Sequence, residues 1–312
     1  MPKIADSGIT NWTPDRLPDL AGKTYLVTGG NSGIGFEASR MLGEAGGDIV
    51  IACRDPAKAE KAVAELKQSV KGKVETVALD LADLSSVRTA AEEIHTRYDT
   101  LDALVNNAGI MQTPETRTVD GFELQLGTNH LGHFLLAGLL FDLVEKAEGR
   151  IVIVSSIAHK YGIIYRDDLM LEKSYSPTSA YTQSKLANLM FAIELDRRLR
   201  AKNLPVKAIA CHPGYSNTAL QSTGPAGLLN VLYTFLNPIM AQPAGKGAIP
   251  TVLAAAGTEA QSGAYYGPTG WGDARGPVGD AFVARRALNE ETAAWLWEAS
   301  EKLTGFEWTK LD

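Results

Sequence analysis

The sequence predicts an α/β fold, a single doubly wound parallel sheet with helices on both faces. Short runs rich in Val, Ile, Leu and Ala alternate with helix-like stretches of ten or more residues, which is typical of βαβ units. The runs are almost continuously apolar, as expected for strands that are covered on both faces. The chain shows no internal repeat and no interdomain linker, so we assign residues 1–312 to one domain.

The predicted strands and helices alternate along most of the chain. We expect strands at 23–29, 48–54, 74–80, 101–109, 150–156 and 206–214. We expect helices at 35–46, 56–70, 84–98, 122–145 and 179–202. Right-handed crossovers between successive parallel strands then place the helices on both sides of the sheet. A last amphipathic helix is expected to begin after its N-cap, Asn289, and to stop at Gly305.

Two regions lack this alternation. Residues 1–21 are polar and contain Pro, so we predict an N-terminal arm rather than a targeting sequence. Residues 215–285 accumulate Gly, Pro and aromatic residues, which favours a substrate flap and loops over one end of the sheet. The most apolar part of this region, 227–240, is shorter than the roughly 20 residues that cross a membrane. We therefore predict a mobile flap and no integral membrane segment, with a peripheral membrane contact as the alternative.

The composition excludes some kinds of partner. The net charge of −6 argues against a nucleic-acid partner, because broad binding to phosphate backbones needs an excess of basic residues. Cys53 and Cys211 each follow an apolar run, so we interpret them as two buried thiols without a disulfide or a metal cluster. Such free thiols fit a reducing compartment, and we predict a cytoplasmic location.

A glycine-rich loop, "TGGNSGIG", follows the first predicted strand and opens the first predicted helix. Gly29, Gly33 and Gly35 permit a tight turn, let the backbone approach a pyrophosphate and leave room for the helix against the strand. The freed N–H groups and the helix dipole then face the anion. This strand–turn–helix context predicts a Rossmann-type dinucleotide site. The other predicted contacts of the loop are Asn31, Ser32 and Ile34.

The end of the second predicted strand, "ACRD", indicates which dinucleotide is bound. An NAD-selective site would place an acidic side chain there, to bond the ribose 2′-hydroxyl. Cys53 stands at that point instead, and Arg54 follows it. Because a guanidinium pairs with a 2′-phosphate, we predict a preference for NADP(H), with Ser32 as an added hydroxyl donor. The alternative is that Arg54 is an exposed cation that pairs with Asp55.

The segment "YTQSK" places Tyr181 and Lys185 four residues apart, on one face of a predicted helix. A nearby ammonium favours the phenolate form of a tyrosine, so the pair could exchange a proton near neutral pH. Taken alone, such a pair is more often an ordinary feature of a helix face. Four histidines show no metal-ligand spacing, and we expect packing or hydrogen-bonding roles for them. They are His130, His133, His159 and His212.

Several motifs occur in a fixed order that resembles the short-chain dehydrogenase/reductase family. They are the glycine loop, "NNAG" at 106–109, "SS" at 155–156, "YTQSK" and "HPG" at 212–214. The resemblance covers roughly residues 23–218. Further detail, including "TNHLGHFLL", "SSIAH" and "YTQSKLANLMF", is similar to the retinol-dehydrogenase-like branch, here without a membrane anchor.

The resemblance implies the roles of the site residues. Asn129, Ser156, Tyr181 and Lys185 would form the catalytic tetrad, with Ser156 rather than Ser155 on the substrate oxygen. Lys185 would also bond the nicotinamide ribose, and Asn129 would hold a water in a proton relay. The remaining cofactor contacts implied by the resemblance are Asp80, Leu81, Asn107, Ala108, Gly109, Pro213, Gly214 and Thr218, with Asp80 and Leu81 near the adenine unless they only lead into a helix.

We therefore predict an NADP(H)-dependent oxidoreductase that transfers a hydride between nicotinamide and an apolar carbonyl or alcohol. The stretch between Ser156 and Tyr181 is longer than in compact members of the family. Within it, Tyr161, Tyr165 and Met170 could face the substrate or could simply pack. The alternative function is a nucleotide-binding regulatory or scaffold protein on the same fold. Members of the family often pair through two long helices, so a homodimer and a monomer both remain open.

Overall fold

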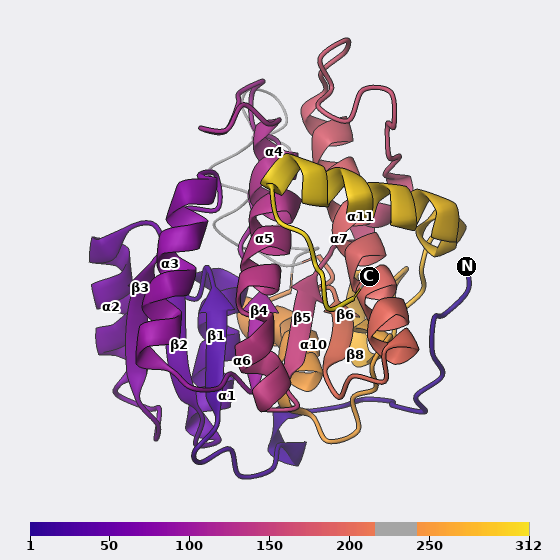
Figure 1. Ribbon diagram of the computed structural model, residues 1–312. Coiled ribbons are helices and arrows are strands. Elements are labelled where there is room, and N and C mark those ends of the chain that lie inside the picture. The colour runs from indigo at the N-terminus through magenta and orange to yellow at the C-terminus, as the bar shows by residue number, and fades with distance from the viewer. Residues whose placement is uncertain (216–241, 312) are drawn as a thin grey trace.

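A computed structural model of the chain describes residues 1–215 and 242–311. All eight strands of the sheet described below lie within these ranges (Figure 1). The predictions for Thr218 and for the apolar flap at 227–240 fall outside the described residues.

The described chain forms one eight-stranded sheet in the order β3-β2-β1-β4-β5-β6-β7-β8. All neighbouring strands pair in parallel except β7 and β8, which are antiparallel. The strands are β1 (Thr24–Thr28), β2 (Asp48–Cys53), β3 (Val74–Ala78), β4 (Ala103–Asn106), β5 (Arg150–Val154), β6 (Lys207–Cys211), β7 (Tyr265–Gly270) and β8 (Arg275–Asp280). The predicted doubly wound α/β fold is confirmed, with one added antiparallel edge strand.

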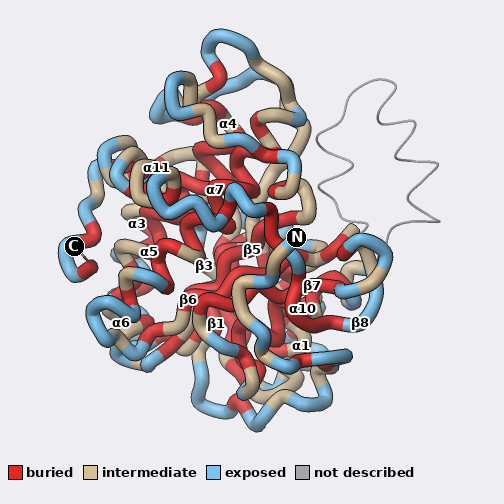
Figure 2. The backbone as a smooth tube through the Cα atoms, turned by 90° about the vertical axis from the view of Figure 1, so that its right-hand side faces the viewer, coloured by how far each residue is buried: buried red, intermediate tan, exposed pale blue. Residues whose placement is uncertain are grey.

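Helices cover both faces of the sheet, and each face has its own hydrophobic core. One core packs α3, α5, α7 and α11 against the strands, and the other packs α1, α2 and α10. Figure 2 shows the buried strands in red between these two layers. Among the described residues, the α-helices of six residues or more are α1 (Gly33–Glu44), α2 (Pro56–Leu66), α3 (Leu84–Arg97), α5 (Gly132–Leu139), α6 (Phe141–Lys146), α7 (Pro177–Ala201), α10 (Ala244–Ala256) and α11 (Glu290–Thr304).

The strand order reverses at β1, which lies between β2 and β4. The chain leaves β1 towards one face of the sheet and leaves β4 towards the other, so a crevice opens at the carboxyl ends of these two strands. Both the glycine loop and the "NNAG" segment follow strands at this edge. The topology therefore brings the predicted nucleotide-binding residues together.

Helix caps explain where several helices begin. Asn289 accepts a hydrogen bond from the backbone N–H of Thr292 at 2.7 Å, and Gly305 ends the same helix in the left-handed conformation at φ 59°. Both predictions for this helix are confirmed. Asp83 caps α3 through the N–H groups of Ser85 and Ser86, so the predicted alternative for Asp80, a helix-leading cap, is taken by a different aspartate.

The region predicted as flap and loops at 215–285 contains regular structure in its described part. Residues 244–256 form α10, and β7 and β8 extend the sheet by two strands. Their sequences, "YYGPTG" and "RGPVGD", are rich in Gly and Pro, which are depleted in strands. Gly267 is required by packing, because a Cβ at this position would lie 2.0 Å from Nε2 of His212.

The predicted helix at 122–145 is broken into four pieces. A short α4 (Leu124–Leu126) leads into a π-helical turn at Gly127–Leu131, and α5 and α6 follow. Such π turns occur mostly as single interruptions of α-helices, frequently at functional sites. Asn129 lies in the middle of this turn, and no feature of the apolar periodicity distinguishes a π turn from an α turn.

The N-terminal arm is packed against the rest of the protein. Ser7 donates hydrogen bonds to Asp280 from its backbone N–H at 2.9 Å and from its hydroxyl at 2.8 Å. The N–H of Trp12 donates to the carbonyl of Val278 at 3.1 Å, and the Trp12 side chain is 1% exposed. The arm therefore covers β8, which ends the sheet, and satisfies backbone groups that an edge strand would otherwise present to solvent.

Helix α11 lies across α7 and α5 on one face of the molecule (Figure 1). The ring of Trp297 on α11 packs against Phe134 of α5 and Phe191 of α7, at centroid distances of 5.2 and 5.8 Å. Helices α5 and α7 belong to the two long helical segments, 122–145 and 179–201, through which members of the family often pair, and the sequence left a homodimer and a monomer both open. A dimer that used the faces now covered by α11 would require this helix to move.

Within residues 1–215 and 242–311, none of the helices has both the length and the apolar character needed to cross a bilayer.

We predict that replacing Trp12 by Ala destabilises the protein by about 3–5 kcal/mol, because the substitution leaves a cavity beneath the N-terminal arm. Urea unfolding of the two proteins measures this difference. Trp271→Ala is the matched control, since that side chain is 81% exposed, and we expect it to change stability by less than about 0.5 kcal/mol. Equal effects of the two substitutions would show that the arm is not held by Trp12.

Candidate active site

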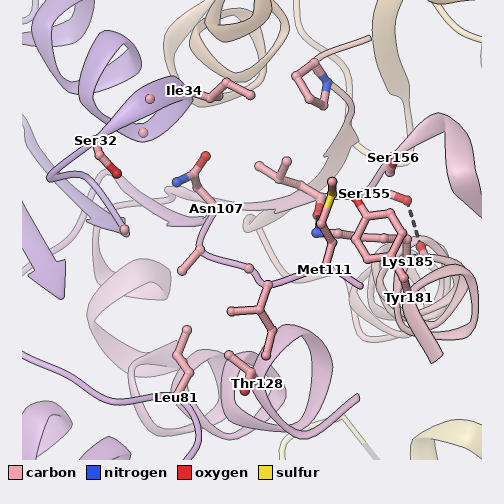
Figure 3. A pocket seen from close by; sticks show the side chains of 18 of the residues that line it. Ser32, Ile34, Leu81, Asn107, Met111, Thr128, Ser155, Ser156, Tyr181 and Lys185 are labelled. Atoms are coloured by element: carbon pink, nitrogen blue, oxygen red, sulfur yellow. Dashed lines mark hydrogen bonds between the residues drawn. The ribbon is translucent and has the colours of Figure 1, made fainter. Parts of the chain in front are cut away.

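A cavity of about 580 Å³ lies at the carboxyl ends of the parallel strands. Figure 3 shows Ser32 and Ile34 at one end of it, Ser156, Tyr181 and Lys185 at the other, and Asn107 between them. The predicted residues that line the cavity are Gly29, Asn31, Ser32, Gly33, Ile34, Gly35, Arg54, Asp80, Leu81, Asn107, Ala108, Gly109, Ser156, Tyr181, Lys185, Pro213 and Gly214. Asn129 is the one described member of the predicted set outside this lining.

The glycine loop has the shape that a dinucleotide needs. Gly29 and Gly33 have φ values of 65° and 57°, in the left-handed region that favours glycine. A Cβ on Gly35 would lie 2.4 Å from Nδ2 of Asn107 and 2.5 Å from the carbonyl oxygen of Gly29. The amide of Asn107 also donates to the carbonyl of Thr28 at 2.8 Å. The two loops are thus bonded together, and their exposed backbone forms a cradle that fits a pyrophosphate at the start of α1.

Two cations line the cavity at the end of β2. The predicted alternative, an Arg54–Asp55 ion pair, is not formed, because the carboxylate of Asp55 accepts from the N–H of Lys58 and pairs with its ammonium at 3.4 Å. Arg54 is exposed and has no ion-pair partner among the described residues. Lys58 was not among the predicted residues. Its position in the first turn of the helix that follows "ACRD" is the signal that could have identified it.

The two cysteines differ in their surroundings. Both are free thiols; Cys211 is buried, as predicted, whereas Cys53 is half-buried and lines the cavity. The prediction of a buried Cys53 is therefore wrong, because the last residue of β2 faces the crevice rather than a covering helix. Burial raises the pKa of both thiols, that of Cys211 to about 12, so both are protonated at neutral pH.

Lys185 is enclosed beneath the cavity. Its side chain is buried, and its ammonium donates to the carbonyl of Val154, the last residue of β5, at 3.2 Å. Burial lowers the pKa of Lys185 from 10.5 to about 8, since a low-dielectric site disfavours the charged form. Gly109 keeps the Lys185 ammonium accessible from the cavity, because a Cβ at position 109 would lie 3.3 Å from the Lys185 Nζ atom.

The two neighbouring serines have different bonds. The hydroxyl of Ser155 donates to the backbone carbonyl of Lys185 at 2.7 Å (Figure 3). The hydroxyl oxygen of Ser156 accepts from the N–H of Ala158 at 3.1 Å, at the start of the 3-10 helix Ile157–Tyr161. The Ser156 bond uses the oxygen as an acceptor and leaves its proton to be donated. The geometry therefore favours Ser156 over Ser155 as a donor into the cavity.

Asn129 lies behind the cavity wall rather than on it. Its side chain accepts from the N–H of Ile110 at 2.8 Å and donates to the Ile110 carbonyl at 2.9 Å. It also donates to the hydroxyl of Ser184 at 2.9 Å, and that hydroxyl donates to the carbonyl of Tyr181. Asn129 thus connects the segment after "NNAG" to the helix that carries Tyr181 and Lys185.

His133 extends the same network to the glycine loop. Its Nδ1 donates to the carbonyl of Asn129 at 3.0 Å, so its Nε2 is the acceptor for the hydroxyl of Thr28 at 2.8 Å. Burial lowers the pKa of His133 to about 4, and the ring is neutral at physiological pH. No group of three or more metal-ligating side chains occurs within residues 1–215 and 242–311.

The substrate end of the cavity combines expected and unexpected residues. Tyr161 and Tyr215 line it, whereas the sulfur of Met170 accepts from the N–H of Glu123 and packs on α4. Elsewhere in the lining, Thr128 lies beside Leu81 (Figure 3). The lining residues that the sequence did not identify are Ile110, Met111, Gln112, Thr128, Ile157, Thr178 and Thr182. Their position beside the recognised motifs is the only signal the sequence carries for them.

A buried ion pair ties this end of the cavity to the β7–β8 hairpin. The ammonium of Lys160 lies 2.6 Å from the carboxylate of Asp273, and the two side chains are 11% and 3% exposed. The N–H of Tyr215 donates to the carbonyl of Ala274 in the same hairpin at 2.8 Å. The hairpin therefore holds both the turn after Ser156 and the turn after β6.

Comparison with known proteins gives a consistent result. A family model described as short chain dehydrogenase matches residues 23–228. Human retinol dehydrogenase 12 is 40% identical over 293 residues, which covers 93% of this chain and 88% of that protein. Human retinol dehydrogenase 14 is 38% identical over 304 residues, which covers 92% of this chain and 87% of that protein.

Solved structures share the fold. A crystal structure of an uncharacterized protein from Mycobacterium paratuberculosis superposes with a TM-score of 0.79 at 40% identity, covering 96% of this chain and 99% of that one. A structure from Beutenbergia cavernae, described as an NAD(P) dependent gluconate 5-dehydrogenase with bound NADP at low occupancy, has a TM-score of 0.61 at 25% identity. The superposition covers 77% of this chain and 91% of that one.

We predict that Lys185→Met stabilises the cofactor-free protein at pH 7. In the unfolded chain Lys185 loses its proton around its ordinary pKa of 10.5, whereas in the folded protein it loses it at about 8. Below pH 8 the folded protein therefore bears the full free-energy cost of burying the charged ammonium. Since each pKa unit is worth about 1.4 kcal/mol, the stability gap is on the order of 3 kcal/mol at pH 7.

The difference in the free energy of unfolding between Lys185→Met and the wild type should then shrink to about zero as the pH rises from 8 to 10.5. Urea unfolding at several pH values measures it. Lys61→Met, on the exposed side of α2, is the matched control and should show no such dependence. A Lys185→Met gap that stays constant with pH would mean that the buried charge is not its cause.

Proposed function

Since this chain belongs to the short chain dehydrogenase family and is an oxidoreductase acting on CH–OH groups, we propose that it transfers a hydride between NADP(H) and an apolar carbonyl or alcohol. The main support for the proposal is the arrangement of three side chains in the cavity. Ser156, Tyr181 and Lys185 lie together at one end of a cavity whose other end is the glycine loop. A dinucleotide that extends from the loop would bring its nicotinamide to these three side chains.

Tyr181 is the proposed proton donor to the carbonyl oxygen, and the acceptor in the reverse reaction. A bound nicotinamide supplies the hydride, and the protein's residues manage the proton and the charge on oxygen. Lys185, with a pKa of about 8, is mostly charged at neutral pH and favours the phenolate form of Tyr181. Ser156 donates a hydrogen bond to the oxygen as negative charge develops there.

We propose that Asn129 acts from behind the cavity, by holding the path that returns a proton to Tyr181. A Cβ on Gly109 would lie 3.2 Å from the Asn129 Oδ1 atom and 3.3 Å from the Lys185 Nζ atom, so both groups flank this one glycine. A water between Lys185 and the Asn129 peptide would complete the relay to solvent. The bonds from Asn129 to Ile110 and Ser184 support this role, because they fix the peptide in place.

Arg54 supports the preference for NADP(H). It is an exposed guanidinium at the end of β2, lines the cavity, and has no ion-pair partner within the described ranges. Lys58 adds a second positive charge on the same side. A 2′-phosphate on the adenosine ribose would place two negative charges between these side chains, where an NAD-selective site would carry a carboxylate.

The substrate is proposed to be apolar. Ile110, Met111 and Ile157 line the cavity beside Tyr181, and such side chains favour hydrocarbon over sugar. The relatives named retinol dehydrogenases support an apolar alcohol or aldehyde of this kind. The alternative, a nucleotide-binding regulator without turnover, gives no reason for Ser156, Tyr181 and Lys185 to meet at one end of the cavity.

We predict that Tyr181→Phe lowers kcat by at least about 100-fold, because the variant has no proton to donate. The assay follows NADPH oxidation with a panel of aliphatic, aromatic and polycyclic carbonyls. NADPH binding, measured by fluorescence titration, should stay within about twofold of the wild type. The matched control is Tyr98→Phe, which removes a hydroxyl bonded to Glu75 outside the cavity. Turnover that survives in Tyr181→Phe would refute the mechanism.

We predict that Arg54→Ala weakens NADPH binding by roughly 10- to 100-fold, since a charge-assisted hydrogen bond contributes about 1.5–3 kcal/mol. NADH binding should be nearly unchanged, so the ratio of the two dissociation constants shifts. Lys61→Ala, an exposed cation on α2 that does not line the cavity, controls for the overall charge. An unaltered ratio in Arg54→Ala would refute the assignment of the 2′-phosphate site.

A further inference from the structure

Three buried aromatic side chains form a stack beneath the cavity. Tyr265 of β7 packs edge-on against His159 at a centroid distance of 5.4 Å and is tilted against His212 at 5.1 Å. The exposed fractions of the three side chains are 2% or less. None of them lines the cavity, so an effect on the reaction would pass through residues that do. We call these three residues the His–Tyr–His stack.

One end of the stack holds Ser156. The Nδ1 atom of His159 lies 2.6 Å from the carbonyl oxygen of Ser156, and only a protonated Nδ1 can donate to it. The other nitrogen, Nε2, then accepts from the N–H of Ala284 at 3.2 Å. The two bonds fix one neutral tautomer, and burial supports it by lowering the pKa of His159 to about 4.

The other end holds the turn after β6. The Nδ1 atom of His212 accepts from the backbone N–H of Gly214 at 3.1 Å, and the backbone N–H of His212 donates to the carbonyl of Tyr266 at 2.9 Å. Gly214 has φ 68° and cannot carry a side chain, because a Cβ would lie 2.4 Å from the carbonyl of Ala274. Pro213 and Gly214 line the cavity.

Tyr265 connects the two ends. Its hydroxyl lies 3.3 Å from Nδ1 of His159 and 3.5 Å from the carbonyl oxygen of Ser156. Burial raises the pKa of Tyr265 well above its usual value, so the hydroxyl keeps its proton and reinforces the same carbonyl. A core that needed only volume would be filled by apolar side chains, because buried polar groups are costly unless they are bonded.

We propose that the His–Tyr–His stack is a positioning unit, which fixes Ser156 and the Pro213–Gly214 turn relative to each other across the cavity. The proposal rests on the proposed function, since it assigns the unit to the reaction of that site. His159 acts through Ser156 and therefore on the chemical step. His212 acts through Pro213–Gly214 and therefore on cofactor binding.

The first test is a double-mutant cycle between His159 and Ser156. His159→Leu should lower kcat by roughly tenfold, the usual effect of losing one positioning hydrogen bond. NADPH binding should stay within about twofold. In a Ser156→Ala background the same substitution should lower kcat by less than about twofold, because residue 156 then has no hydroxyl to be positioned, although its backbone carbonyl still accepts from His159. An equal loss in both backgrounds would overturn the proposal in favour of a structural role.

Conservative variants keep the test informative if a leucine variant does not fold. His159→Asn places an amide N–H near the position of Nδ1 and should recover most of the kcat lost in His159→Leu. Tyr265→Phe keeps the ring stack and removes only the hydroxyl; it should lower kcat without changing the unfolding temperature by more than a few degrees. If Tyr265→Phe keeps the wild-type kcat and the double-mutant cycle shows no coupling between His159 and Ser156, the stack contributes only packing.

The second test separates the two ends of the stack. His212→Leu should raise the dissociation constant of NADPH by roughly tenfold and leave kcat at saturating cofactor within about threefold. His212→Asn, which offers an acceptor near Nδ1, should restore binding. Identical effects of the His159 and His212 variants on kcat and binding would overturn the assignment. Full activity in Ser156→Ala alone would instead contradict the proposed function, and so the two failures are distinguishable.

Discussion

The hydroxyl of Thr28 is the point on which the geometry of the site depends. It accepts from the N–H groups of Asn107 and Ala108 at 2.9 Å each, and donates to Nε2 of His133 at 2.8 Å. Strand pairing ends at this edge of the sheet, so side chains must hold the loops that follow β1 and β4. One buried hydroxyl therefore joins the glycine loop, the "NNAG" segment and the helix of Asn129. A methyl group in its place would leave two backbone donors without an acceptor.

The parts of the protein that the sequence predicts best are those with a short period or a fixed spacing. The strands β1, β2, β4, β5 and β6 are buried along most of their length and are therefore largely apolar. The edge strand β3 is the exception, because it exposes Glu75. The glycine loop and the Tyr181–Lys185 pair can be identified from the sequence because their residues lie only a few positions apart. Their meeting in one cavity follows from the order of strands, which the alternation of elements also predicts.

What the sequence does not predict depends on contacts between distant segments. The strand β7 contains Gly267 because His212 packs against its backbone, a reason that lies more than fifty positions away. The burial of Trp12 depends on a strand near the other end of the chain. The position of Asn129 behind the cavity wall depends on a π-helical turn, and the half-exposed Cys53 depends on which face the end of β2 presents.

The dependence of Ser156 on β7 and on Ala284 has a consequence for synthesis on the ribosome. A chain is made from its N-terminus, and its early segments fold first. The glycine loop, "NNAG", Tyr181 and Lys185 all precede residue 215, whereas Tyr265, Asp273 and Ala284 emerge last. A nascent chain thus acquires its nucleotide-binding loops before the contacts that fix Ser156. Premature termination before residue 265 would remove Tyr265, Asp273 and Ala284 together, and with them the contacts that fix Ser156.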